Sequence, residues 1–344
     1  MRALKLSKKD ENKLYGVLSK FGEVWSPVPK GSRFVYAKIE DKKDLILRKE
    51  CVRTILPVKK FLMPPDFNIL DFTPQKYSIP NEEIPTTVVV GVPACEIHAV
   101  NILTKFYTTD FVDNYYMKRR EKLVIIGKSG IPDEHCFCHK TNTSIVEEGY
   151  DLFLFDLGDY YLVWVGSEIG DDIVRLGSDI FQENVPKDVA QKFVEFRKRK
   201  QSKFTNDVDL EGVTDLMELM YEADFWDELG DKCLSCGQCT MVCPTCTCFN
   251  IIDDLELNKE EGHRRRYWDS CQFKDYSLVA GRHNFRESKA ERLKLWYTHK
   301  LKAFIGHFGS PSCVGCGRCI VTCPVDINVP KIVAQLKKGG KNEI

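Results

Sequence analysis

The segment CLSCGQCTMVCP, residues 233–244, decides the fold of the C-terminal part of the chain. Its spacing, C-x2-C-x2-C-x3-C-P, returns in the segment CVGCGRCIVTCP at residues 313–324. This is the arrangement that holds [4Fe–4S] clusters in bacterial two-cluster ferredoxins. Zinc is the alternative, but zinc sites use two cysteine pairs separated by a long gap. The two segments therefore predict two [4Fe–4S] clusters.

The spacing also predicts how the ligands are shared. The first three cysteines of such a run hold one cube, and the fourth ligates the neighbouring cube. Gly237 and Gly317 follow the second cysteine of each run, and we interpret them as places where the backbone approaches the cluster without a Cβ. Crossed ligation predicts Cys233, Cys236, Cys239 and Cys323 for the first cluster, and Cys313, Cys316, Cys319 and Cys243 for the second.

The composition of the 344 residues is that of an ordinary globular protein, with 43% apolar and 29% charged residues. Fifty basic and fifty acidic residues cancel, which argues against nucleic acid or an anionic membrane as the main partner. The first twenty residues lack the apolar stretch of a secretory signal, and no apolar run is long enough to span a membrane. Fifteen cysteines then indicate a reducing compartment, so we expect a cytoplasmic protein.

The chain ahead of the cysteine runs has the pattern of an α/β domain. Thr86–Val92 is a β-branched run typical of a buried strand, Ala94–Phe106 has helical spacing, and Leu123–Gly127 predicts a second buried strand. This order favours a parallel βαβ crossover. We predict an α/β or α+β scaffold and docking domain over residues 1–207. Neither G-x-G-x-x-G nor a P-loop is present, so we expect no flavin or NAD(P) on this chain.

The remaining part of the chain favours helices. Sixty-nine residues separate Cys243 from Cys313, far more than a compact ferredoxin needs. Helical patterns occur at Asp215–Leu229, Ile251–Leu257 and Glu287–Leu301, with little strand character between them. We therefore predict an all-α, helical-ferredoxin-like two-cluster domain over residues 208–344.

Seven cysteines lie outside the two runs. Two close pairs and one single residue are hard to reconcile with packing alone, although free cysteine packs well as a small apolar side chain. We predict a third cluster between the domains, with the pairs on irregular loops and about twelve irons per chain, at four per cubane. Cys95 is a reserve ligand, and Cys51 is interpreted as simply buried. The candidate ligands, four of which the cluster would use, are Cys136, Cys138, Cys246, Cys248 and Cys271.

An arginine-rich stretch precedes Cys271. Two interpretations stay open for it: offsetting the negative charge of thiolate-ligated cubes, or forming an exposed basic face. The residues concerned are Arg264, Arg265, Arg266 and Arg282.

Segments spread along most of the chain resemble the beta subunit of cytoplasmic sulfhydrogenases (NiFe hydrogenases) and, less closely, the A-type subunit of anaerobic sulfite reductases. One departure is Glu96, where aspartate is expected in relatives, which leaves its role open. The segments that carry the resemblance are 54–60, 63–65, 91–96, 113–116, 136–138, 243–248, 267–271, 281–286 and 313–319.

The resemblance implies an iron–sulfur electron-transfer subunit of a soluble anaerobic oxidoreductase complex. Its partners would be a flavin- and NAD(P)-binding subunit of ferredoxin-reductase type and a catalytic subunit, either a NiFe hydrogenase or a sulfite reductase. The chain itself is then not expected to be catalytic. Two alternatives stay open: a reductase of sulfur compounds with an open third cluster, and a stand-alone ferredoxin-like carrier.

Overall fold

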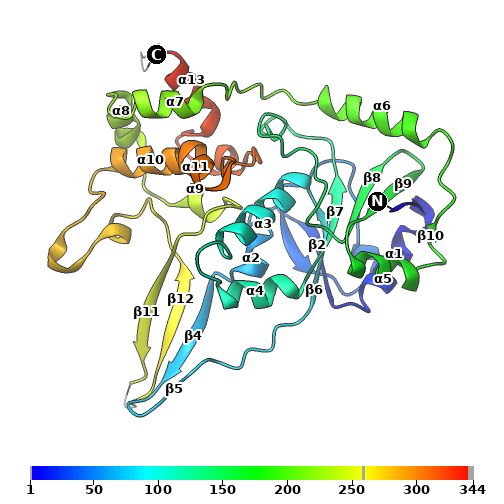
Figure 1. Ribbon diagram of the computed structural model, residues 1–344, viewed down its shortest axis with the longest axis horizontal. Coiled ribbons are helices and arrows are strands. Elements are labelled where there is room, and N and C mark those ends of the chain that lie inside the picture. The colour runs from blue at the N-terminus through cyan, green and yellow to red at the C-terminus, as the bar shows by residue number, and fades with distance from the viewer. Residues whose placement is uncertain (1, 258–259, 340–344) are drawn as a thin grey trace.

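The computed structural model of the chain describes residues 2–257 and 260–339 (Figure 1). A mixed sheet with helices on both faces forms one half of the molecule, and helices around the cysteine runs form the other. A second, narrow sheet projects from between the two halves (Figure 1). The predicted order, an α/β region followed by a helical one, is confirmed.

The large sheet has four parallel strands at its centre. In spatial order its strands are β10 (Phe181–Gln182), β1 (Arg2–Ser7), β9 (Tyr160–Val165), β8 (Leu152–Asp156), β7 (Leu123–Ser129), β6 (Thr87–Val92), β2 (Glu23–Lys30) and β3 (Arg33–Lys38). Strands β2, β6, β7 and β8 run parallel, and the outer pairs are antiparallel. β6, helix α3 (Ala94–Phe106) and β7 form the predicted crossover, with Val88 beside Val124.

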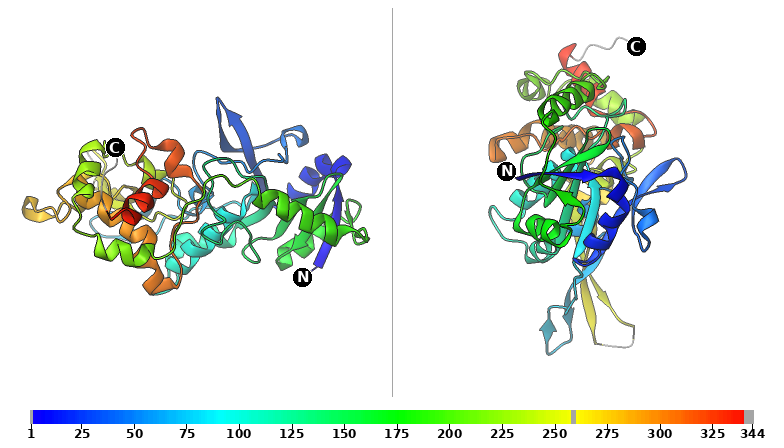
Figure 2. Two further views of the ribbon diagram at one scale, coloured as in Figure 1. Left: turned by 90° about the horizontal axis from the view of Figure 1, so that it is seen from above. Right: turned by 90° about the vertical axis from the view of Figure 1, so that its right-hand side faces the viewer.

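Both faces of this sheet are covered, which explains why β6 is apolar at successive positions. Val88 and Val90 join one core, whereas Val89 and Val92 join the other. The first face is covered by α1 (Glu11–Leu18) and α5 (Glu168–Leu176). The second face is covered by α2 (Lys59–Leu62), α3, α4 (Asn114–Glu121) and α6 (Val189–Gln201). Figure 2 shows the molecule from above and from the right-hand side of Figure 1.

The cysteine runs lie among helices whose apolar sides meet in a third core. These helices are α7 (Val213–Leu219), α8 (Phe225–Lys232), α9 (Gln238–Met241), α10 (Lys289–Thr298), α12 (Arg318–Thr322) and α13 (Val329–Lys337), and α11 (Phe304–Phe308) lies between α10 and α12 in the chain. Met217, Trp226, Tyr297 and Leu336 are buried in this core, with most of the ferredoxin-type cysteines packed at its edge. A π-helical turn at His299–Ala303 joins α10 to α11. Short 3-10 turns occur at Lys8–Asp10, Lys42–Asp44, Lys274–Ser277 and Ala280–Arg282.

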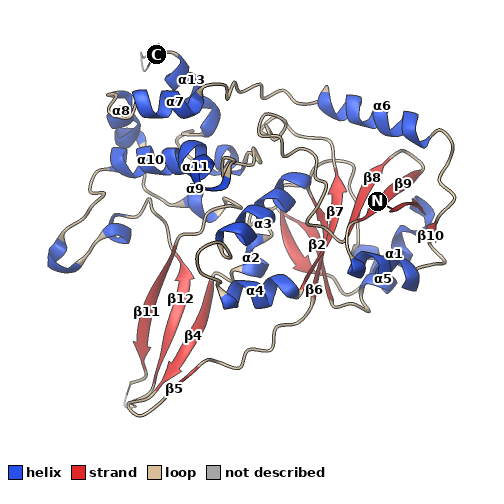
Figure 3. Cartoon of the chain, in the orientation of Figure 1, coloured by secondary structure: helices blue, strands red, loops and turns tan. Residues whose placement is uncertain are grey.

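The expectation of a helix at Ile251–Leu257 is wrong. The segment belongs to β11 (Phe249–Leu255), which pairs with β12 (Gly262–Trp268) in the narrow sheet, drawn in red in Figure 3. β12 pairs in turn with β4 (Asp66–Phe72), and β4 with β5 (Tyr77–Ser78). The helical region is therefore not purely α. β11 is stabilised by its hairpin partner β12, and β12 by β4, which lies nearly two hundred residues away in sequence; the apolar pattern of residues 251–257 reveals neither partner.

The helix expected at Asp215–Leu229 is two helices, α7 and α8, separated at residues 220–224. Trp226 donates a hydrogen bond from Nε1 to the carbonyl of Met220 at 2.9 Å across that break. The domain boundary proposed at 207/208 lies in the connection between α6 and α7.

Candidate metal centres

The two cysteine runs have the same backbone conformation. Ser235 and Gly315, each one residue before the second cysteine, have positive φ angles of 52° and 60°. Gly237 and Gly317, each one residue after it, have φ of 70° and 72°, and each begins a short helix, α9 or α12. A left-handed residue at the start of a helix is best supplied by glycine. Identical spacing has therefore produced two copies of one loop.

The neighbours of these glycines are protein segments. A Cβ on Gly237 would lie 2.7 Å from the ring of Phe273, and a Cβ on Gly317 would lie 2.5 Å from the carbonyl oxygen of His135. The interpretation made from the sequence, close approach of backbone to a cluster, is not tested by these contacts. They show a second reason for glycine, which is close packing of each run against another loop.

The four cysteines predicted for the first cluster line one cavity. Cys233, Cys236, Cys239 and Cys323 surround it together with Pro324. Trp296 and Tyr297 of α10 close its inner side. Within residues 2–257 and 260–339, no three metal-ligating side chains converge on one point as a single ion would require. Thiols that ring a space fit a four-iron cube better than a zinc ion.

The thiols predicted for the second cluster are also neighbours. Burial, followed by the proximity of Cys313, Cys316 and Cys243, raises the pKa of Cys319. Burial likewise raises the pKa of Cys313 to about 11 and that of Cys316 to about 12. Iron binds the thiolate, so binding of a cluster to these thiols would release protons.

The five candidate ligands of a third cluster fall into two groups. Cys246, Cys248 and Cys271 pack in the core of the helical region together with cysteines of both runs. Cys136 and Cys138 pack instead with Cys95 against the second run. Both pairs lie on irregular loops, as expected. Since each group has its own neighbours, the structure does not bring the five thiols together around one point.

The helical-side group has two buried lysines beside it. Lys300 donates a hydrogen bond from Nζ to Oγ1 of Thr245 at 3.0 Å, and Lys59 donates one to the carbonyl of Cys246 at 3.2 Å. A hydrogen bond from Cys271 lowers the pKa of Cys248 to about 6. The group therefore combines a thiol of lowered pKa, Cys248, with two buried lysine side chains.

The arginines singled out from the sequence are held by carboxylates on the narrow sheet and at its base. Arg264 pairs with Asp253 at 2.7 Å, Arg265 with Asp66 at 2.6 Å, and Arg266 with Asp113 at 2.5 Å. Arg282 is exposed and has a positive φ of 62°. In the described structure, none of the hydrogen bonds or ion pairs of Arg264, Arg265 and Arg266 reaches a cysteine.

Cations that do lie beside the cysteines were missed, and Arg318 is the clearest. It lies inside the second run, is buried, and pairs with the buried carboxylate of Glu96. It also donates to the carbonyl of Thr54 at 3.1 Å, while Glu96 accepts a hydrogen bond from the backbone of Val58 at 2.8 Å. These contacts give Glu96 a structural role that its sequence position left open. In the sequence, the feature that could have pointed to Arg318 is its place between Cys316 and Cys319.

In the described part of the chain, no helix has the length and apolarity needed to cross a membrane. Residues 232–327 match the family model of the 4Fe-4S dicluster domain. Along nearly its full length, the chain is similar to sulfhydrogenase 2 subunit beta of Pyrococcus furiosus: the two are 34% identical over 340 residues, covering 98% of this chain and 99% of the relative. The dicluster match bears out the prediction of two [4Fe–4S] clusters.

Proposed function

This chain belongs to the family of sulfhydrogenase beta subunits, and on that basis we propose that it relays electrons inside a multi-subunit hydrogenase complex. Its two [4Fe–4S] clusters would each accept and release one electron at a time. The chain itself supplies ligands, spacing and electrostatic surroundings, and the reaction with substrate belongs to partner subunits. At one end of the relay the partner is a flavin- and NAD(P)-binding protein, and at the other it is a hydrogenase or a sulfite-reducing protein.

The observation that carries this proposal is the pairing of the two runs. Cys323 of the second run borders the same cavity as Cys233, Cys236 and Cys239 of the first. When each run supplies one cysteine to the other run's cluster, the two cubes lie next to each other. Stepwise electron transfer requires such neighbouring clusters. The proposed ligand sets are those of crossed ligation, with Cys243 completing the second cluster beside Cys313, Cys316 and Cys319.

One edge of this pair is accessible to a partner. Cys236 is exposed, and the neighbouring Leu234 exposes 60% of its surface. By contrast, the run at residues 313–323 lies against the loop of Cys136 and Cys138. We assign electron exchange with a partner's cofactor to the exposed edge at Cys236.

A third cluster remains part of the proposal. The packing of Cys246, Cys248 and Cys271 together in the helical core supports these three as its ligands. Cys136 and Cys138, the other two candidates, have different neighbours. Three thiols would leave one iron without a cysteine, which is the feature that a reductase of sulfur compounds would need.

Burial argues against that second function. Cys246 and Cys271 expose only 5% and 8% of their surfaces, so a substrate has little access to them. The stand-alone carrier is disfavoured too, because a transient docking surface is usually strongly charged and this chain has zero net charge.

Co-purification tests the relay directly. The full chain, carrying an affinity tag and expressed in its native host under anaerobic conditions, should retain a flavoprotein and a hydrogenase or sulfite-reducing protein. NAD(P)H should then reduce the clusters of the complex but not those of the separated chain. As a matched pair, Leu234→Glu at the proposed exchange edge should slow this reduction, whereas Leu219→Glu on α7, also exposed, should not. Recovery of the tagged chain without such partners would contradict the proposal.

Flavin content provides an independent check. The purified single chain should hold no stoichiometric flavin, because neither phosphate-binding fingerprint occurs in its sequence. Flavin released by acid from the separated chain, at one per chain, would point to a self-contained reductase.

A further inference from the structure

Four cysteines outside the ferredoxin-type runs meet in the α/β region. Sγ of Cys136 lies 3.3 Å from Sγ of Cys138, and both pack with Cys95 in one buried cluster. Cys51, Cys95 and Cys136 line a small cavity that also touches Cys316 of the second run. Cys95, Cys136 and Cys138 are all at least 95% buried.

Three separate segments bring these thiols together. Cys51 lies in the loop after a bridge between Glu50 and Ile131, which aligns that loop with the approach to Cys136. The backbone of Cys51 donates a hydrogen bond to the carbonyl of Ile131 at 2.8 Å. Cys95 is the second residue of α3 and is buried. The fold thus brings together four metal-ligating side chains: Cys51 from the loop after the bridge, Cys95 from the first turn of α3, and Cys136 and Cys138 from an irregular loop.

We propose that Cys51, Cys95, Cys136 and Cys138 hold a further iron–sulfur cluster next to the second ferredoxin-type cluster. The inference rests on the proposed relay, which it extends into the α/β region. It takes Cys136 and Cys138 away from the mixed ligand set predicted from the sequence, and it gives ligand roles to Cys95 and Cys51. The loop of residues 136–138 is irregular, so its side chains can rotate apart to fit around a cube.

The loop of Cys136 and Cys138 is in direct contact with the second run. Phe137 donates a backbone hydrogen bond to the carbonyl of Gly315 at 2.9 Å, and Thr143 donates one from Oγ1 to the carbonyl of Val314 at 2.7 Å. A Cβ on Gly315 would lie 2.6 Å from the backbone of Cys138. A cluster on these thiols would therefore be a direct neighbour of the one at residues 313–319.

Two arginines, each paired with a carboxylate, line the cavity beside these thiols. Arg53 lines the cavity with Arg318 and donates from Nε to the carbonyl of Cys316 at 2.8 Å. Both guanidinium groups are held in place, Arg53 by Asp133 and Arg318 by Glu96. Fixed cations of this kind offset the net negative charge of a thiolate-ligated cluster.

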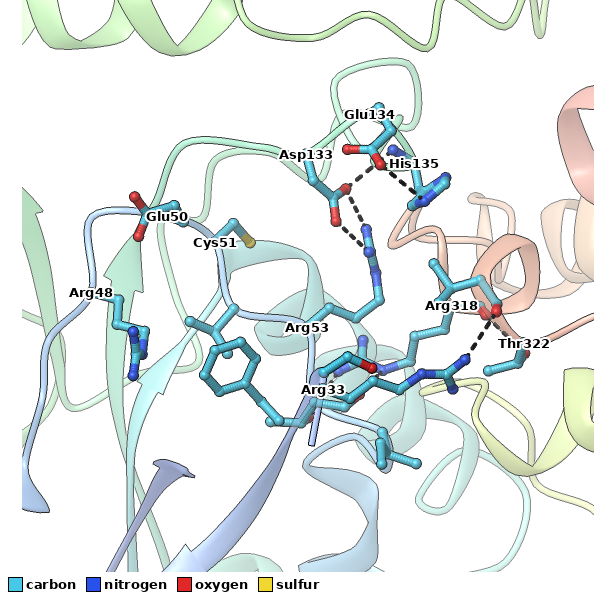
Figure 4. Close-up of a pocket in the computed structure, with 16 residues that line it drawn as sticks. Arg33, Arg48, Glu50, Cys51, Arg53, Asp133, Glu134, His135, Arg318 and Thr322 are labelled. Atoms are coloured by element: carbon cyan, nitrogen blue, oxygen red, sulfur yellow. Dashed lines mark hydrogen bonds and ion pairs between the residues drawn. The ribbon is translucent and has the colours of Figure 1, made fainter. Parts of the chain in front are cut away.

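The site also borders a larger opening. A cavity of about 370 Å³ is lined by Arg33, Arg48, Cys51, Arg53 and Arg318, among others, and Figure 4 shows Cys51 beside Arg53 at its wall. Of the four thiols, Cys51 is the one on this wall. It is therefore the ligand nearest to solvent, and the other three lie deeper.

Iron and acid-labile sulfide counts on the full chain, purified anaerobically, test the site. Cys95→Ser and Cys138→Ser should each lower iron by about four per chain relative to wild type, at four irons per cubane. Cys51→Ala should lower it by about one to four on the same basis, since it removes one corner ligand. Ala99→Ser is the matched control, because Ala99 is buried in the same cluster of side chains but cannot ligate iron. Unchanged iron and sulfide in Cys95→Ser and Cys138→Ser would overturn the proposal, and an unchanged count in Cys51→Ala would overturn the four-thiol set.

A measurement on the wild-type chain covers the case in which a variant does not fold. Anomalous diffraction at the iron edge should place an iron peak between Cys95, Cys136 and Cys138, separate from the two at the ferredoxin-type runs. Absence of this peak in crystals that show the other two would overturn the inference. The relay itself would survive that result, because it depends on the runs at residues 233–243 and 313–323 and on partner binding.

Discussion

The two cysteine runs share their spacing and backbone conformation, yet they lie in different environments. The second position of the first run is exposed at Cys236, whereas Cys316 is half-buried against the α/β region. Position six of the run is the exposed Gln238 in one copy and the buried Arg318 in the other. A repeated motif therefore sets the ligands, while the surrounding fold decides which cluster meets a partner and which passes electrons inward.

Removing one ligand from each run should give the largest effect. Cys236→Ala and Cys316→Ala should each lose one cube, about four irons per chain, because each removes one of the four thiolates that hold it. Stability should fall as well, because bound metal contributes to the free energy of folding. The melting temperature should fall further for Cys316→Ala, whose loop is packed against the α/β region, than for Cys236→Ala at the surface. Iron analysis and thermal unfolding under anaerobic conditions check this. Wild-type iron in both variants would contradict the ligand assignment.

Exchanging the residue that differs between the runs should give the next largest effect. Arg318→Met leaves the carboxylate of Glu96 buried without its partner, which costs about 3–5 kcal/mol. Gln238→Met, the equivalent change in the exposed run, should alter stability by about 0.5 kcal/mol or less. Thermal unfolding of both variants gives the comparison.

A double variant sharpens this prediction. Combining Arg318→Met with Glu96→Leu removes both charges and should recover much of the lost stability. If Arg318→Met unfolds at the same temperature as Gln238→Met, the buried pair is not what distinguishes the second run.

Alanine at the two left-handed glycines should give the smallest difference. Both Gly237→Ala and Gly317→Ala place a Cβ in a left-handed backbone, at a cost of about 1–2 kcal/mol each. Gly317→Ala should cost more, because its Cβ meets the backbone carbonyl of His135, whereas the ring of Phe273 beside Gly237 can shift. Chemical unfolding followed by circular dichroism measures both. Equal losses would show that local conformation alone accounts for the cost.

Local patterns predicted the regular elements well where a segment is buried on both faces or on one clear stripe. The bounds of α3 are those expected from its helical spacing, and β6 and β7 form the expected parallel pair. The prediction failed at β11, because Ile251 and its neighbours form a strand only through pairing with β12. Residues 249–255 taken alone contain no trace of that partner.

Local sequence also predicted one part of the candidate site and not the other. Covalent spacing alone brings three cysteines of each run around one loop, so the sequence determines the dicluster motif. The grouping of the other seven cysteines depends on contacts between residues far apart in the chain, such as Cys51 with Cys95 or Cys138 with Gly315. Likewise, the pairing of Arg318 with Glu96 joins residues 222 positions apart. Long-range packing decides such contacts, because burial makes an unpaired charge costly only once the chain has folded around it.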